Sequence, residues 1–321
     1  MKQSRARGRN AIGLLVSLGI LSCESSSGPA SERRELSAPA PLSDVSATES
    51  ESQLKGVAGA LLVVDEQGSR SRDLQALLRE LSPRRIETSD PYYKKSKRFL
   101  AVPLASLLAL LWPDLKNHEA RLHTPEASAR LPEIQLHASD GYLVRLAADL
   151  AFHPSAYIAF ADVDHPPFEP IGEQKANPAP LYLIWEGKAF PNLETHPRPW
   201  SIVRVTRLKG GSGLEHLQPT AGFGSDRAAQ AGYVLFNQDC LRCHSINQQG
   251  GRVGPDLNVP QNILEYRPLE QVRAYIKDPR TFRYGTMPAH PHLSEQNLDE
   301  IVAYLRLMKD SKFDPHVASA P

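Results

Sequence analysis

Cysteine is scarce in this sequence: only three of its 321 residues are cysteines, at positions 23, 240 and 243. So small a number excludes a disulfide framework. The N-terminal apolar run, residues 11–21, is shorter than the ~20 residues that an ordinary membrane-spanning helix needs. Charge of one sign is not in excess either, because the formal net charge is +1. This balance gives no indication of nucleic-acid binding.

The N-terminus has the pattern of an export signal, because four basic residues precede the short apolar run: Lys2, Arg5, Arg7 and Arg9. The run ends Ile20-Leu21-Ser22-Cys23, which resembles a bacterial lipoprotein cleavage box. The resemblance implies a signal peptide over residues 1–22 and a lipid on Cys23. We therefore expect a protein anchored by lipid on the periplasmic side of a bacterial membrane. An ordinary secretory peptide, in which Cys23 has no special role, is the alternative.

The other two cysteines stand in the run Cys240-Leu241-Arg242-Cys243-His244. Two thiols three positions apart can each form a thioether to a haem vinyl group, and His244 can then bind the iron. A zinc site would need a second pair of ligands. A redox dithiol of the thioredoxin type would need no histidine in the fifth position. The motif therefore predicts one covalently attached haem c.

The composition, 41% hydrophobic and 23% charged, is typical of a globular protein with about two domains. Residues 23–53 are rich in Ser, Glu, Ala and Pro and predict a lipidated, disordered tether. Residues 54–209 combine short apolar runs with many prolines, which predicts an α+β domain built mainly of strands. A Gly-rich stretch begins a predicted linker over residues 210–224. Residues 225–313 predict an all-α domain.

Within the first predicted domain, apolar residues alternate with others over residues 134–146, around Asp140-Gly141, a pair typical of a hairpin turn. The basic aromatic run at 92–98 is interpreted as a solvated loop. Other apolar runs predict strands at 61–64, 157–160, 181–185 and 200–208, and a helix at 104–112.

Three helices are expected in the second predicted domain. Asp226 is a candidate N-cap for the first, and residues 269–276 form the second. Ser294 is the candidate N-cap of the last, with Asn297 at the third helical position instead of the Glu or Gln of a full capping box. Basic residues around the middle helix, Arg273 and Lys277 among them, predict a basic face that would steer an acidic partner.

The second predicted domain resembles class I c-type cytochromes through several separate features: Gly232 and Phe236 before the motif, Gly254-Pro255 after it, the run Gly285-Thr286-Met287-Pro288, and Tyr304 in the last helix. The resemblance implies that Met287 is the second axial ligand of the iron, opposite His244. It also implies that the Pro255 carbonyl accepts a hydrogen bond from Nδ1–H of His244, which would fix the orientation of the ring.

The choice of Met287 also follows from the short list of methionines. Met1 is lost with the leader, and Met308 lies on the apolar stripe of the last helix, where packing is the expected role. Met287 stands in a loop flanked by Gly and Pro. His290 and His292 stay as alternatives, because they are close enough in sequence to reach the same face. A haem with two histidines would have a lower potential than one with His and Met.

The first predicted domain resembles the molybdopterin-binding domain of the sulfite-oxidase type in four stretches: 136–142, 159–164, 180–185 and 200–208. That family binds molybdenum through a protein cysteine, and residues 54–209 contain none. The resemblance therefore implies a degenerate copy, kept for docking partners rather than for catalysis.

The leading hypothesis is a non-enzymatic, monohaem c-type cytochrome that carries electrons between a periplasmic donor and a periplasmic acceptor. An iron held by His244 and Met287 has no vacant position for a substrate, which favours electron transfer over catalysis at the haem. Two alternatives stay open. One is an oxidoreductase whose first domain binds a cofactor or substrate and passes electrons to its own haem, and the other is a haem-based redox or ligand sensor.

Overall fold

The computed structural model describes residues 51–52, 54–116, 131–208 and 214–315. The predicted signal peptide, Cys23 and nearly all of the predicted tether lie outside these residues. Among the residues described, the structure has no helix with the length and apolar character needed to cross a membrane.

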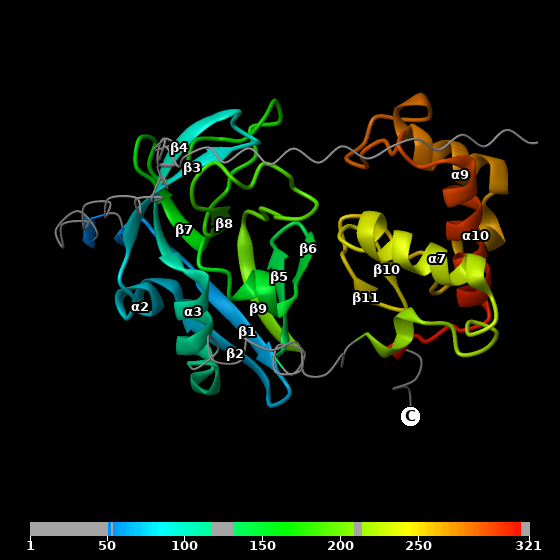
Figure 1. Ribbon diagram of the computed structural model, residues 1–321, viewed down its shortest axis with the longest axis horizontal. Coiled ribbons are helices and arrows are strands. Elements are labelled where there is room, and N and C mark those ends of the chain that lie inside the picture. The colour runs from blue at the N-terminus through cyan, green and yellow to red at the C-terminus, as the bar shows by residue number, and fades with distance from the viewer. Residues whose placement is uncertain (1–50, 53, 117–130, 209–213, 316–321) are drawn as a thin grey trace, which may run out of the picture. The chain divides into compact units, whose positions relative to one another are not determined.

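Residues 54–208, here called the β-rich region, contain two sheets (Figure 1). The five-stranded sheet has the order β2-β1-β9-β5-β6 and the four-stranded sheet the order β3-β4-β7-β8. Strands β1 and β9 pair in parallel, and all other neighbours in these sheets pair antiparallel. The strands are β1 (Ala60–Asp65), β2 (Gly68–Asp73), β3 (Arg84–Asp90), β4 (Lys95–Pro103), β5 (Glu133–Ala138), β6 (Leu143–Leu146), β7 (Ala156–Asp162), β8 (Tyr182–Trp185) and β9 (Ile202–Leu208).

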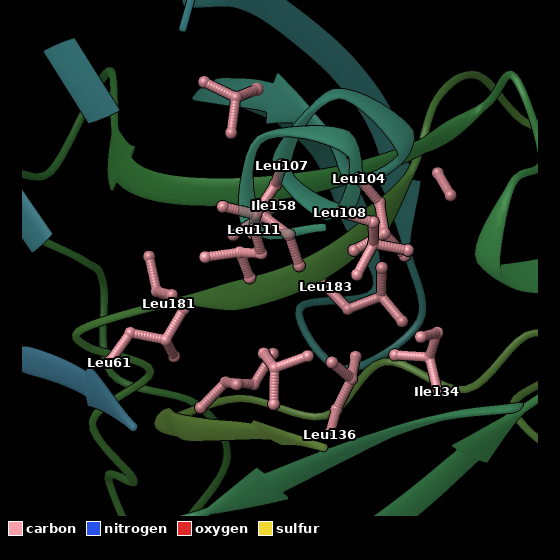
Figure 2. Close-up of a cluster of buried hydrophobic side chains, with 14 of the residues drawn as sticks. Leu61, Leu104, Leu107, Leu108, Leu111, Ile134, Leu136, Ile158, Leu181 and Leu183 are labelled. Carbon is pink, nitrogen blue, oxygen red and sulfur yellow. The ribbon is translucent and has the colours of Figure 1, made fainter. Parts of the chain in front are cut away.

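Short helices complete this region: α2 (Leu74–Arg79), α3 (Leu104–Leu111), the 3-10 turn η1 (Pro113–Leu115) and α6 (Ala148–Ala151). Four leucines of α3 point into the core, where they lie with apolar side chains from strands of both sheets, such as Leu136 of β5 and Ile158 of β7 (Figure 2). The core therefore lies between the two sheets and is completed by α3. The mainly-β character expected of residues 54–209 is confirmed.

The local predictions are confirmed for the hairpin and for most strands. Strands β5 and β6 pair from Ile134 with Leu146 to His137 with Leu143. Their turn contains Gly141, whose φ of 92° is a conformation that glycine adopts without strain. Strand β7 is buried along its whole length because alternate residues enter two different apolar clusters: Ile158 and Phe160 face the main core, and Tyr157 and Ala159 face the opposite side.

The interpretation of residues 92–98 as a solvated loop is wrong. Strand β4 begins at Lys95, and the side chain of Lys97 is only 2% exposed, where it pairs with the buried carboxylate of Asp162. The Tyr92 ring meets the edge of Trp200 at a centroid distance of 4.7 Å. A buried ammonium is tolerated here because a carboxylate faces it across the strands, and such a partner is not visible in the local sequence.

Residues 214–315, here called the helical region, contain helices α7 (Arg227–Leu235), α8 (Ile263–Tyr266), α9 (Leu269–Lys277) and α10 (Glu295–Lys309), the π-helical turn η3 (Phe236–Cys240), and the 3-10 turns η2 (Glu215–Leu217) and η4 (Pro279–Thr281). One two-residue ladder, β10 (Ser245–Ile246) with β11 (Gln249–Gly250), departs from the all-α expectation. Asn247 and Gln248 join these strands with φ values of 54° and 65°, as a tight hairpin turn requires.

The caps expected for this region are present. The Asp226 carboxylate accepts from the Ala229 backbone N–H at 2.9 Å and begins α7. Ser294 and Asn297 bond each other's backbone N–H groups at 3.1 and 3.0 Å, so asparagine completes the capping box at the start of α10. Leu217, which falls within the predicted linker, is fully buried in the core of the helical region, and Tyr304 donates to its carbonyl.

Helices α7 and α10 cross at Gly232, where the two backbones approach without an intervening side chain. A Cβ at position 232 would lie 1.9 Å from the carbonyl oxygen of Glu300 and 2.9 Å from the nitrogen of Ile301. Because both atoms belong to the backbone of α10, the helices would have to separate to admit even a methyl group.

We therefore expect Gly232→Ala to destabilise the protein by at least about 2 kcal/mol, since overpacking costs about 1–3 kcal/mol even where side chains can adjust. This loss exceeds the gain of about 1 kcal/mol that alanine brings to an open helix. Thermal unfolding of the haem-loaded protein measures it. Gly224→Ala is the control, because a Cβ there meets nothing within 4 Å. Equal melting temperatures for both variants would contradict this account of the crossing.

Candidate functional site

The Cys240–His244 segment is positioned by the end of the first long helix of the helical region. Helix α7 passes into η3, whose last residue is Cys240. The backbone N–H groups of Cys243 and His244 then donate to the Cys240 carbonyl at 3.0 and 2.9 Å, which turns both cysteines and the histidine around one carbonyl oxygen. Both thiols are free and half-buried. Burial raises the pKa of Cys240 to about 12 and also raises that of Cys243, so both groups are thiols at neutral pH.

The His244 imidazole is held by a backbone acceptor. Its Nδ1 lies 2.8 Å from the Pro255 carbonyl oxygen, and because a carbonyl can only accept, Nδ1 carries the proton. The other ring nitrogen, Nε2, therefore presents a lone pair. Burial lowers the pKa of the ring, which favours this neutral form. The tautomer is the one that a metal ligand needs.

Gly254 lies directly against this ring. A Cβ built at position 254 would be 2.3 Å from Cε1 and 2.6 Å from Nδ1 of His244. The Gly254 N–H donates to the Cys243 carbonyl at 2.8 Å, so the segment before Pro255 lies along the motif itself. The absence of a side chain at position 254 is therefore what lets the Pro255 carbonyl reach the imidazole.

The Asp256 side chain also holds residues 254–256 in place. Its carboxylate accepts from the Ser245 hydroxyl and from the backbone N–H groups of Gln248, Asn258 and Val259, at distances of 2.7 to 2.8 Å. Four hydrogen bonds to one carboxylate fix the loop that carries Pro255 relative to the residues that follow His244.

A ladder of three buried asparagines extends this anchorage to the end of α10. The side-chain amide of Asn262 donates to Asn258 and to the Leu305 carbonyl, that of Asn258 to Asn247 and to the Met308 carbonyl, and that of Asn247 to the carbonyls of His216 and Ser311. The ladder thereby connects the segment after the motif to backbone carbonyls in the last turns of α10 and just beyond it.

Met287 is half-buried in the loop between η4 and α10. The same loop carries His290 and His292, and Nε2 of His292 lies 3.5 Å from the carboxylate of Asp239, the residue directly before Cys240. The structure therefore brings the Met287 loop to the attachment motif. Met308, in contrast, is fully buried on α10, which confirms its packing role.

The basic face expected around the middle helix is wrong for its two central members. Arg273 pairs with Glu295 at 2.7 Å and also with Asp299, and Lys277 pairs with Glu295 at 3.4 Å. These acidic side chains on α10 offset much of the positive charge on α9, because oppositely charged groups at such distances largely cancel each other's field.

Arg242, the second of the two residues between the cysteines, was not singled out by the sequence and is hydrogen-bonded to the β-rich region. Its carbonyl accepts from the Leu143 N–H at 2.9 Å, and its guanidinium donates to the Glu194 carbonyl at 3.0 Å. The Arg252 N–H donates to the Gly141 carbonyl at 2.8 Å. The start of β6 therefore contacts the motif, and the turn before it contacts the loop that follows the motif.

A second group that sequence reasoning missed is basic and lies beside this turn. Burial and the charges of Arg204 and Arg252 lower the pKa of His137 to about 3, and burial and Arg252 also lower the pKa of the Arg204 guanidinium. Nε of Arg204 is buried without a hydrogen-bond partner. The unsatisfied buried donor of Arg204 beside the cationic Arg252 is suited to an anion. His137 is neutral beside them, and its Nε2 lies 3.2 Å from the Thr206 hydroxyl.

The residues of the motif fit a covalent haem. Both thiols are free, Nε2 of His244 is a lone-pair donor by the tautomer argued above, and a thioether side chain is carried on a loop brought to the motif. These are the ligand types of a c-type haem with His and Met axial ligands.

Comparison with known proteins defines the class of this region. Residues 229–309 match the family model of Cytochrome c. This match covers most of α7 and continues to the end of α10, and it includes every residue of the motif. The helical region is therefore a cytochrome c domain, and the family implies covalently bound haem c.

Two curated relatives add the wider context. The chain is 33% identical over 118 residues to the cytochrome c oxidase subunit 2 of Alkalihalophilus pseudofirmus, which is 34% of this chain and 34% of that protein. It is 26% identical over 98 residues to the cytochrome c oxidase subunit 2 of Bacillus sp. (strain PS3), which is 26% of this chain and 27% of that protein. The chain thus spans about a third or less of the length of these relatives. Together with the family match, they support haem-based electron transfer.

We expect Gly254→Ala to push the His244 ring away from the Pro255 carbonyl, because a methyl group has no room beside the imidazole. The purified variant should contain clearly less haem per protein than the wild type, and its remaining haem should have a changed absorption spectrum. Haem content and optical spectra measure this. The control is Gly224→Ala, which adds the same methyl group in open space. A Gly254→Ala protein with normal haem content and spectrum would show that the close contact is unimportant.

Proposed function

We propose that this chain is a monohaem c-type cytochrome that carries electrons on the periplasmic side of a bacterial membrane. The observation that carries the proposal is the His244 imidazole, held by the Pro255 carbonyl in the tautomer that leaves Nε2 for a metal, directly after two free thiols within a match to the Cytochrome c family.

Each residue of the site has a role in this proposal. Cys240 and Cys243 hold the haem through thioethers, and His244 and Met287 are the axial ligands of its iron. Pro255 keeps the imidazole in place. The bound haem supplies a one-electron couple, and axial ligation by histidine and methionine favours the ferrous state more than two histidines would. With both axial positions taken by side chains, the protein has no catalytic residue to assign.

The β-rich region serves in this proposal to dock redox partners. The hydrogen bonds of Arg242 and Arg252 to the turn between β5 and β6 support this role, because they connect that region to the residues around the haem attachment. The donor is a periplasmic dehydrogenase or quinol-oxidising complex. The acceptor is a second carrier or an oxidase, and the similarity to cytochrome c oxidase subunit 2 of two bacteria supports an oxidase.

A second candidate function is an oxidoreductase in which the β-rich region binds an anionic cofactor or substrate and passes electrons to the haem. The observation that favours it is the group of His137, Arg204 and Arg252 with its unpartnered buried Nε. The resemblance to the sulfite-oxidase type points to the same class, and the missing cysteine argues against molybdenum. Molybdenum recovered in a one-to-one ratio with the protein would favour this candidate.

A haem-based sensor is the third candidate, and displacement of Met287 by carbon monoxide at neutral pH would favour it.

We expect Met287→Ala to lose the weak far-red absorption band that arises from a methionine–iron bond, while the wild type shows this band and a low-spin spectrum. The reduction potential should fall, because the thioether that favours ferrous iron is gone. Oxidised and reduced optical spectra and a redox titration measure both effects.

Met308→Leu is the matched control, since it removes the buried methionine of α10 and conserves an apolar side chain of similar volume. A high-spin wild type, or spectra that are identical for wild type and Met287→Ala, would exclude the ligand assignment and favour a ligand-binding haem.

The proposed anchor predicts that Cys23→Ser moves the protein from the membrane fraction to the soluble periplasmic fraction, because serine cannot carry the thioether-linked lipid. Fractionation followed by haem staining measures this. Ser22→Ala is a control that leaves Cys23 in place. If wild type and Cys23→Ser distribute alike, the leader is an ordinary signal peptide.

A further inference from the structure

Two imidazoles and one carboxylate meet beside the haem-attachment motif. One oxygen or nitrogen atom from each of Asp239, His290 and His292 can be chosen so that all three atoms lie within 4.8 Å of one another. Nε2 of His292 is 3.5 Å from Oδ1 of Asp239, and the two imidazole rings have a centroid distance of 5.6 Å. We infer that these three residues form a binding site for one divalent transition-metal ion of the zinc type.

The ligand set selects this class of metal. Imidazole nitrogen together with carboxylate oxygen suits Zn²⁺ and its first-row neighbours, whereas Ca²⁺ and Mg²⁺ prefer oxygen ligands alone. Three protein ligands with a remaining position for water are a common arrangement for zinc. Burial lowers the pKa of His290, so its ring is neutral at pH 7 and has a lone pair to donate.

The backbone holds the three side chains in place. Asp239 belongs to η3, and its side chain is only 10% exposed. The backbone of His290 is held by two hydrogen bonds. Its N–H donates to the Ile276 carbonyl at 3.1 Å, and its carbonyl accepts from the Leu293 N–H at 3.2 Å. Pro291 separates the two histidines and restricts the backbone between them. The ligands therefore come from two anchored segments that the fold brings together, rather than from a flexible tail.

The site also gives His290 and His292 a role other than binding the haem iron, for which the sequence alone kept them as alternatives. Asp239 is adjacent to Cys240, so a cation bound here would lie next to the attachment of the haem. A nearby positive charge disfavours the more positive, oxidised form of the iron. The metal site thus goes beyond the proposed electron transfer and provides a means by which a metal ion modulates it.

The test is a titration of the haem-loaded, full-length protein with Zn²⁺ in competition with a chromophoric chelator. We expect the wild type to bind one Zn²⁺ with a dissociation constant below about 10 μM, and Asp239→Asn and His292→Ala to bind at least about tenfold more weakly, since each loses one of three ligands. His165→Ala is the matched control, because it removes an exposed imidazole from the β-rich region. It should bind as the wild type does.

Three outcomes would overturn the inference. They are a wild type that does not compete with the chelator, variants at 239 and 292 that bind as tightly as the wild type, and a loss in His165→Ala as large as in His292→Ala. Since Asp239 precedes Cys240, its variant could also acquire less haem. His292→Gln then decides the matter, because the His292 side chain is 55% exposed and its replacement leaves the motif untouched. The zinc titration and the haem spectrum are separate measurements. Failure of the proposed axial ligation would appear in the spectrum alone, and failure of the zinc site would appear in the titration alone.

Discussion

The crossing of α7 and α10 at Gly232 is the constraint on which the geometry of the helical region depends. At this point the backbone of one helix lies against the Glu300 carbonyl of the other. Because α7 continues into η3 and ends at Cys240, the position of the crossing also sets the position of the first thiol. The other helix carries Met308 and the carbonyls to which the asparagine ladder attaches. Because Gly232 has no side chain, the close crossing sets the position of the attachment motif relative to α10.

In the helical region, buried polar side chains hold the segment after the motif in place. The Asp256 carboxylate and the three buried asparagines form hydrogen bonds that connect the segment after His244 to α10 and to the residues that follow the motif. The Pro255 carbonyl, carried on that segment, thereby holds the His244 imidazole in one orientation.

Much of this arrangement could be predicted from sequence because the signals are local. The hairpin of β5 and β6 follows from period-two alternation around Asp140-Gly141, and the starts of α7 and α10 follow from capping residues. The motif at Cys240–His244 is a chemical signature whose residues are contiguous. The interpretation of residues 92–98 was wrong because Lys97 is buried against Asp162, its partner on β7. The basic face expected around α9 was wrong at Arg273 and Lys277, because their acidic partners lie on α10. In both places the decisive neighbour comes from a distant part of the chain.

The sequence by itself determined the chemistry expected of the helical region, because Cys240, Cys243 and His244 stand in the contiguous order of a haem-attachment motif within the match to the Cytochrome c family. Only the tertiary structure decided which groups surround them. It set Leu143 beside Arg242, Gly141 beside Arg252, and His290 and His292 beside Asp239. These contacts join residues far apart in sequence, and no local pattern encodes a distance across the fold.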